Sequence, residues 1–194
     1  MPPSSVSRTT AFKLAFIGSH GVGKTTLCYA LAARLKATDV SLEVVQEVAR
    51  RCPLPINEAT GLASESWILH TQIAEEVIAA ERYDVVICDR SALDNYVYLL
   101  LAEGPQPGLE ELVDHWMTTY DLLVHVPIVE EPSVDGVRSD DPAFQSAADE
   151  RLEVELERRG LEALRLDPLA RSRWVDRIEA VVRDRIRPPQ LELL

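Results

Sequence analysis

Short apolar runs alternate along most of the chain with longer segments whose apolar residues recur at helical spacing. The apolar runs predict four strands and a weaker fifth, at residues 11–18, 41–47, 83–89, 121–127 and 161–166. The periodic segments predict helices, at residues 24–37, 61–81, 91–103, 109–120 and 167–186. Strands that alternate with helices predict an α/β protein, with a parallel sheet covered by helices on both faces.

Two segments depart from this rhythm. Residues 1–10 are rich in Ser, Thr and Pro and predict a flexible leader. Residues 128–160 carry few large apolar residues and many charges, and their second half predicts a largely exposed helix. We find no repeat and no internal boundary, so we expect one domain over residues 1–194.

The carboxyl ends of the predicted strands indicate where a ligand binds. In open parallel sheets the ligand lies beyond these ends. Four segments follow strand ends in this chain, at residues 18–25, 47–50, 89–94 and 128–138. We expect them to converge at one edge of the sheet.

Charge and composition exclude some partners. Asp plus Glu number 32 against 20 Lys plus Arg, a net charge of −12. This balance argues against a nucleic-acid polymer as partner, because such binding draws on clustered positive charge. No apolar run reaches about 18 residues, the length of a membrane-spanning helix. We therefore expect a soluble, cytoplasmic protein whose three cysteines are reduced.

The stretch GSHGVGKTT after the first predicted strand carries the clearest chemistry. It fits the P-loop pattern G-x-x-x-x-G-K-[ST] between a strand and a helix. Its glycines let backbone N–H groups surround phosphate oxygens, Lys24 reaches the terminal phosphates, and the Thr25 hydroxyl binds Mg²⁺. The sequence thus predicts an ATP–Mg²⁺ site formed by Gly18, Ser19, His20, Gly21, Val22, Gly23, Lys24, Thr25 and Thr26.

Asp89 is a second candidate for this site. It ends the apolar run VVIC, where a carboxylate can meet Mg²⁺ directly or through water. It also precedes a predicted helix, so a capping role is the alternative.

The class of nucleotide-dependent protein follows partly by exclusion. A GTPase needs a guanine-reading Asn-Lys-x-Asp segment, and neither Asn57 nor Asn95 begins one. The glycine-rich signature of a transporter ATPase is also absent from the sequence. A compact transferase that passes phosphate to a small acceptor remains.

Four segments in order, GSHGVGKTT, VQEVAR, CDRSALDNY and DGVRSDDP, carry a family resemblance. Together they resemble the AAA-type P-loop small-molecule kinases, a family similar to the ribosylnicotinamide kinase domain and to nucleoside and nucleotide kinases. The resemblance covers roughly residues 12–185. It implies a three-layer P-loop nucleotide-kinase fold with a five-stranded parallel sheet, a helical lid at about residues 128–160, and transfer of the ATP γ-phosphate to a nucleoside-like hydroxyl.

The resemblance also implies roles for individual residues. Glu47 and Arg50 would face the acceptor, Asp89 and Arg90 would lie beside the reacting groups, and Arg138 would reach in from the lid. Whether Asp89 or Glu47 orients or deprotonates the acceptor stays open. Each role has a structural alternative: Glu47 could pair with Arg50, and Arg90 could pair with a neighbouring carboxylate.

Further residues would line the acceptor pocket if the resemblance holds. Trp67 and Gln72 lie on the long helix that would form its wall, and Asp94 follows the third strand. The lid segment is dense in acids, which favours an uncharged nucleoside over a nucleotide as acceptor. The rival functions are an ATP-binding regulatory switch and simple hydrolysis, with a protein as partner. A second closed pocket beside Glu47 and Arg50 would favour the kinase.

Overall fold

Five parallel strands form the centre of the fold, in the order β2-β3-β1-β4-β5. The computed structural model describes residues 11–56, 59–129 and 141–186. The strands are β1 (Phe12–Ile17), β2 (Leu42–Val45), β3 (Val85–Asp89), β4 (Leu122–His125) and β5 (Leu164–Arg165). The α-helices are α1 (Lys24–Lys36), α2 (Leu62–Arg82), α3 (Ala92–Glu103), α4 (Pro107–Met117), α5 (Pro142–Arg159) and α6 (Trp174–Ile186), and two 3₁₀ segments are η1 (Val48–Arg51) and η3 (Pro168–Arg173).

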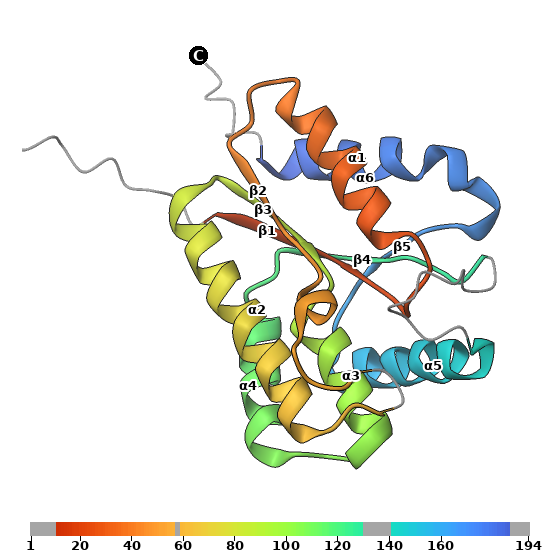
Figure 1. The fold of residues 1–194 in the computed structure, drawn as a ribbon. Helices are drawn as coiled ribbons and strands as arrows, with labels where there is room; N and C mark the ends of the chain where they lie inside the picture. The colour runs from red at the N-terminus through yellow and green to blue at the C-terminus, as the bar shows by residue number, and fades with distance from the viewer. Residues whose placement is uncertain (1–10, 57–58, 130–140, 187–194) are drawn as a thin grey trace, which may run out of the picture.

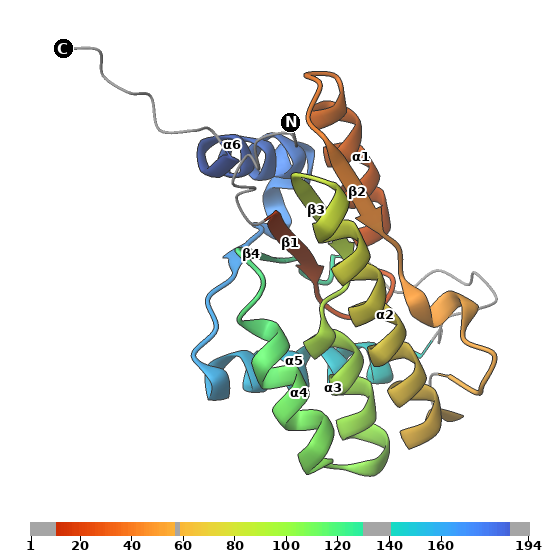
Figure 2. The ribbon, with the colours of Figure 1, turned by 90° about the vertical axis from the view of Figure 1, so that its left-hand side faces the viewer.

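Helices cover both faces of the sheet. Helices α1 and α6 lie on one face, and α2, α3, α4 and α5 lie on the other (Figure 1; Figure 2). The alternation along β1 explains the two cores: Leu14 and Phe16 pack with α1 and α6, whereas Ala15 and Ile17 pack toward α3 and α5. This arrangement confirms the predicted α/β fold with a five-stranded parallel sheet.

Two predicted helix boundaries differ from the structure. Helix α4 begins at Pro107, ahead of the start predicted at residue 109. Proline is well tolerated in the first helical turn because its missing N–H has no partner there. The predicted helix over residues 167–186 is divided: η3 has a kink at Ala170, and the regular helix starts at Trp174.

The buried face of α2 is more polar than the sequence pattern predicts. Leu62 is exposed, while Gln72 and Glu76 are buried beside Leu69. Since buried polar groups need hydrogen-bond partners, this face must be tied to specific neighbours.

Helix α5 is less exposed than predicted. Leu152 and Leu156 are buried against the core of the α3 face, and Gln145 and Glu155 are buried as well. Most of the segment before it, including Arg138, lies outside the described residues. Within the described part of the chain, no helix is both long and apolar enough to cross a membrane.

Candidate functional site

The glycine loop between β1 and α1 is held close to the end of β4. Gly18 has φ 135°, and a Cβ there would lie 2.6 Å from the carbonyl oxygen of Val126. Gly23, the N-cap of α1, has φ 93°. Both positions therefore need glycine, the first for the close approach and both for the backbone angle. The loop leads into the N-terminus of α1, whose free N–H groups favour an anion.

Lys24 turns its side chain back over the loop. Its Nζ donates to the carbonyl oxygens of Gly18, at 2.7 Å, and Ser19. Burial, assisted by the charge of Arg90, lowers the pKa of Lys24 to about 8. Triphosphate oxygens in this loop would compensate the lysine charge and favour its protonated form.

Thr25 and Asp89 meet across the carboxyl ends of β1 and β3. Thr25 Oγ1 donates to Asp89 Oδ2 at 2.6 Å. Asp89 is buried, its pKa is raised by burial, and its Oδ1 has no hydrogen-bond partner among the described residues. A hydroxyl and a carboxylate are hard oxygen donors of the kind that Mg²⁺ prefers. The pair thus fits the predicted metal site.

Asp94 supports the loop from behind. Its Oδ1 accepts from the backbone N–H of Gly18 at 2.9 Å, and its Oδ2 accepts from the N–H and hydroxyl of Ser91. Both oxygens are engaged by the protein and the residue is buried. Asp94 therefore completes the capping box of α3 with Ser91 and supports the phosphate loop, while its contact with the acceptor stays a prediction.

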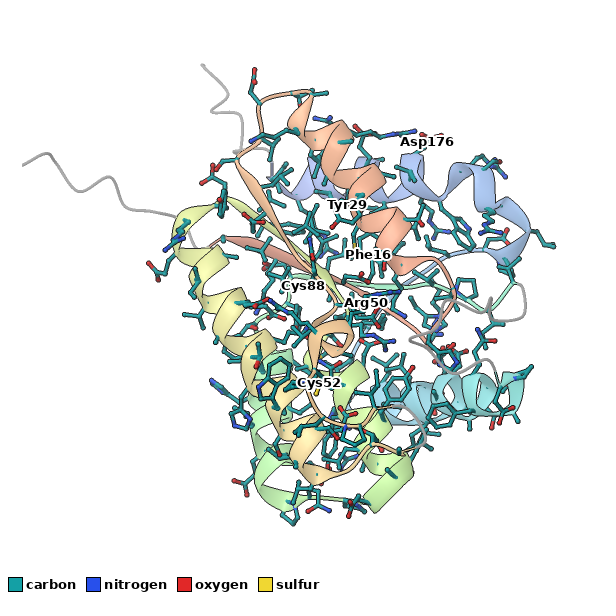
Figure 3. All side chains as sticks on the ribbon, viewed as in Figure 1. Phe16, Tyr29, Arg50, Cys52, Cys88 and Asp176 are labelled. Carbon is teal, nitrogen blue, oxygen red and sulfur yellow. The ribbon has the colours of Figure 1, made fainter. Side chains whose placement is uncertain are left out.

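Glu47 joins two arginines at the end of β2. Its Oε1 accepts from Arg90 Nε at 2.7 Å and its Oε2 accepts from Arg50 Nε at 2.9 Å. Glu47 and Arg90 are buried, whereas the Arg50 side chain is 40% exposed. In Figure 3, Arg50 lies below Tyr29 of α1. The structure thus shows both ion pairs that the sequence offered as alternatives, Glu47 with Arg50 and Arg90 with a neighbouring carboxylate. All three side chains lie at the edge of the sheet where the site was predicted.

Two neighbouring cavities share Glu47 and Arg50. The outer opening is lined by Thr25, Tyr29, Val44, Gln46, Glu47, Arg50, Arg51 and Asp89. The inner pocket is lined by His20, Glu47, Ala49, Arg50, Ile56, Glu65, Ile68, Arg90, Asn95 and Tyr98. One cavity therefore contains the Thr25–Asp89 pair, and the other lies beyond Glu47 and extends to α2 and α3.

Arg90 has an uncommon backbone conformation. Its φ is 97°, which costs a non-glycine residue on the order of 1–3 kcal/mol. Its carbonyl accepts from Gln72 Nε2 at 2.9 Å, and its guanidinium lies 5.1 Å from the ring centroid of Tyr98. Hydrogen bonding, an ion pair and ring contact together hold the arginine in place.

The two predicted acceptor residues on α2 lie elsewhere. Gln72 is buried, and its amide bonds Arg90, Glu76 and Asn95 rather than lining the inner pocket. Trp67 is partly buried and does not line that pocket either. The face of α2 that lines the inner pocket carries Glu65 and Ile68, and an acceptor contact for Gln72 or Trp67 stays a prediction.

Sequence reasoning missed Glu65, Asn95 and Tyr98. Glu65 is buried in the first turn of α2, and Tyr98 OH lies 3.2 Å from His20 Nδ1 in the glycine loop. The available signal was spacing: Glu65 precedes Ile68 and Leu69 by three and four residues, so it shares their buried face.

The fold and the glycine loop define a P-loop protein of the kind that binds nucleoside triphosphates. Residues 18–25, 47–50 and 89–94 converge as predicted, whereas residues 130–140 fall outside the described chain. Residues 13–173 match the family described as AAA domain, and the chain belongs to this family.

Known relatives agree with this placement. The chain is 34% identical over 134 residues to a thymidylate kinase of Thermomicrobium roseum, a match that covers 59% of this chain and 63% of that protein. It thus spans less than two thirds of the length of this curated relative.

Two solved structures share the fold. One is a deoxyadenosine kinase from M. mycoides with bound dATP, with a TM-score of 0.61, 14% identity, and coverage of 90% of this chain and 98% of that chain. The other is a thymidylate kinase from Ehrlichia chaffeensis, with a TM-score of 0.60, 13% identity, and coverage of 92% and 100%. The predicted P-loop nucleotide-kinase fold is confirmed.

Proposed function

We propose that this protein is an ATP-dependent phosphotransferase that moves the γ-phosphate of ATP to a hydroxyl of a nucleoside-like acceptor. The observation that carries the proposal is the pair of adjoining cavities. The outer opening holds the Thr25–Asp89 pair, and the inner pocket lies on the far side of Glu47. A transferase needs two such sites with the reacting groups at their junction.

The donor side is formed by the loop. Its backbone amides and Lys24 would hold the β- and γ-phosphates. Thr25 and Asp89 would hold Mg²⁺, which supplies charge neutralisation on the phosphate oxygens. Because Asp89 bonds Thr25 and lines only the outer opening, we assign it to this side.

The acceptor side supplies the group that orients the hydroxyl. Glu47 lines both cavities, so its carboxylate is the candidate for this role rather than Asp89. Arg90, bonded to Glu47, would stabilise negative charge on the phosphoryl group during transfer. Arg138 stays proposed as a further positive group from a lid over residues 128–160.

The inner pocket also separates the candidate functions. A regulatory switch has no need of a second site beside its phosphates, so the inner pocket favours a kinase over the switch. We propose an uncharged nucleoside rather than a nucleotide as acceptor, because the segment expected to form the lid is dense in acids. We further infer a cytoplasmic location, since the buried thiols of Cys28 and Cys88 suit a reducing compartment.

A screen of acceptors tests the proposal. Purified protein is incubated with ATP, Mg²⁺ and a panel of nucleosides and nucleoside monophosphates, and phosphorylated products are identified by mass spectrometry. We expect at least one nucleoside monophosphate to form with wild-type protein and none with Lys24→Ala. ADP formation without any phosphorylated acceptor would contradict the proposal and indicate hydrolysis.

A further inference from the structure

Glu65 is a buried carboxyl group in the inner pocket that the proposed transfer chemistry does not use. It lies in the first turn of α2, is 5% exposed, and lines the pocket together with Arg90, Asn95 and Tyr98. Buried acidic residues without an ion-pair partner are uncommon, because burial disfavours their charged form. Its position therefore needs an explanation.

The two carboxyl oxygens of Glu65 differ in their contacts. Oε1 accepts from Thr60 Oγ1 at 2.7 Å. Oε2 has no hydrogen-bond partner in the described part of the chain. Thr60 thus fixes one oxygen and leaves the other for a ligand in the pocket.

The charged groups around Glu65 make most of their contacts with each other, although Arg90 Nη1 has no hydrogen-bond partner among the described residues. Arg90 and Arg50 both bond Glu47, and Arg90 also lies over the ring of Tyr98. His20, the other titratable side chain that lines the pocket, has its Nδ1 beside Tyr98 OH. Burial raises the pKa of Glu65 to about 7, against the opposing effects of the Thr60 hydrogen bond and the Arg90 charge. Near neutral pH the group therefore exists as a mixture of the neutral acid and the carboxylate, and the neutral acid predominates as the pH falls below 7.

The rest of the pocket combines apolar walls with a few polar groups. Ile56, Ile68 and the Tyr98 ring supply apolar walls, and Asn95 lines the same cavity. Such a mixture of apolar walls and a few polar groups is typical of small-molecule sites. A ring placed there would present its polar edge to the residues that can hydrogen-bond it.

We propose that Glu65 reads the ring of the acceptor as a neutral carboxylic acid, donating from Oε2 to an oxo group on the ring edge. This inference rests on the proposed kinase function and names the acceptor class: a nucleoside whose base carries an oxo group at the position facing α2. Ionisation of Glu65 removes the donated proton and places a carboxylate against the oxo group. Binding of oxo bases then weakens, while bases with an amino group at that position gain an acceptor.

Matched acceptor pairs test this inference. Inosine and adenosine differ at C6 by oxo and amino groups, and uridine and cytidine differ likewise at C4. We measure kcat and KM for each nucleoside from pH 6.0 to 8.5 with wild-type protein, Glu65→Gln, Glu65→Ala and the control Glu75→Gln. Glu75 lies on the same helix, is partly exposed and pairs with Arg51.

The expected result is a pH-dependent preference. For the oxo member of the better pair, the wild-type KM rises above pH 7, approaching tenfold per pH unit, because only the protonated form binds. Glu65→Gln keeps a neutral donor, so its KM stays within about threefold over the range. Glu65→Ala raises KM by about 10- to 100-fold with little change in kcat. Glu75→Gln behaves like wild type.

Other results would overturn the inference. If the wild-type KM for oxo nucleosides is flat or falls with pH, the role of Glu65 is refuted but the proposed function is not. A Glu65→Gln profile identical to wild type would have the same meaning. No phosphorylated nucleoside from wild-type protein would overturn the proposed function and the role of Glu65 with it. Because the wild-type and Glu65→Gln profiles decide the matter, the test survives if Glu65→Ala fails to fold.

Discussion

Glu47→Gln tests the residue that joins the two cavities. Glu47 makes a buried ion pair with Arg90 at 2.7 Å and a partly exposed one with Arg50 at 2.9 Å. Breaking a buried pair costs about 3–5 kcal/mol, whereas a surface pair contributes about 0–1 kcal/mol. Glutamine keeps one oxygen that can accept from Arg90 Nε, so we expect the lower value, about 3 kcal/mol. For a chain of this size that lowers Tm by about 6–12 °C.

The same variant should reduce turnover more than its stability loss explains. If Glu47 orients or deprotonates the acceptor hydroxyl, kcat falls by about 10²–10⁴-fold at a temperature where the variant is folded. Thermal unfolding and ADP release in the presence of acceptor measure the two effects. Glu75→Gln is the control: its partly exposed pair with Arg51 predicts a Tm change below about 4 °C and unchanged kcat. Wild-type turnover in Glu47→Gln would refute the assignment, and a Tm loss no larger than the control's would refute the buried pair.

Three further predictions concern the loop, its support and the lid. Because the pKa of Lys24 is about 8, triphosphate binding at pH 8 should take up roughly half a proton as the lysine becomes fully charged. Calorimetry in buffers of different ionisation enthalpy measures this proton uptake. Equal binding heats in all buffers would contradict the prediction. Asp94→Asn should weaken the hydrogen bond to Gly18, lowering the free energy of unfolding by about 1–3 kcal/mol and the affinity for ATP about tenfold. An unchanged melting curve would contradict the role of Asp94 in supporting the loop. Arg138→Ala should lower kcat by about 10³-fold with nearly constant acceptor KM; an equal loss in both constants would indicate ground-state binding instead.

The sequence predicts the fold and the donor side of the site well, for a physical reason. Strand runs and the helix that starts in the glycine loop are local patterns, and parallel strands bring their carboxyl ends to one edge. The contacts Thr25–Asp89 and Glu47–Arg90 follow from that topology.

The acceptor side was harder to predict because it depends on which face of α2 turns inward. The apolar spacing over residues 61–81 predicts the helix, but its buried face carries Glu65, Gln72 and Glu76 among apolar neighbours. Tertiary partners make this possible: Glu76, for example, pairs with Lys13 at 2.9 Å inside the core. In the sequence, these buried groups could be found as polar residues spaced three or four positions from apolar residues of the same helix. Only the fold shows which of them line the pocket.

The most direct test of the central claim follows the γ-phosphate of ATP itself. Wild-type protein and Lys24→Ala receive ATP labelled at the γ-phosphate, Mg²⁺ and the best nucleoside of the acceptor panel, and labelled products are separated by chromatography. We predict that label enters the nucleoside with wild-type protein and that transfer falls by at least about 10²-fold in the variant. Label that appears only as inorganic phosphate, or transfer that is unchanged in Lys24→Ala, would contradict the account.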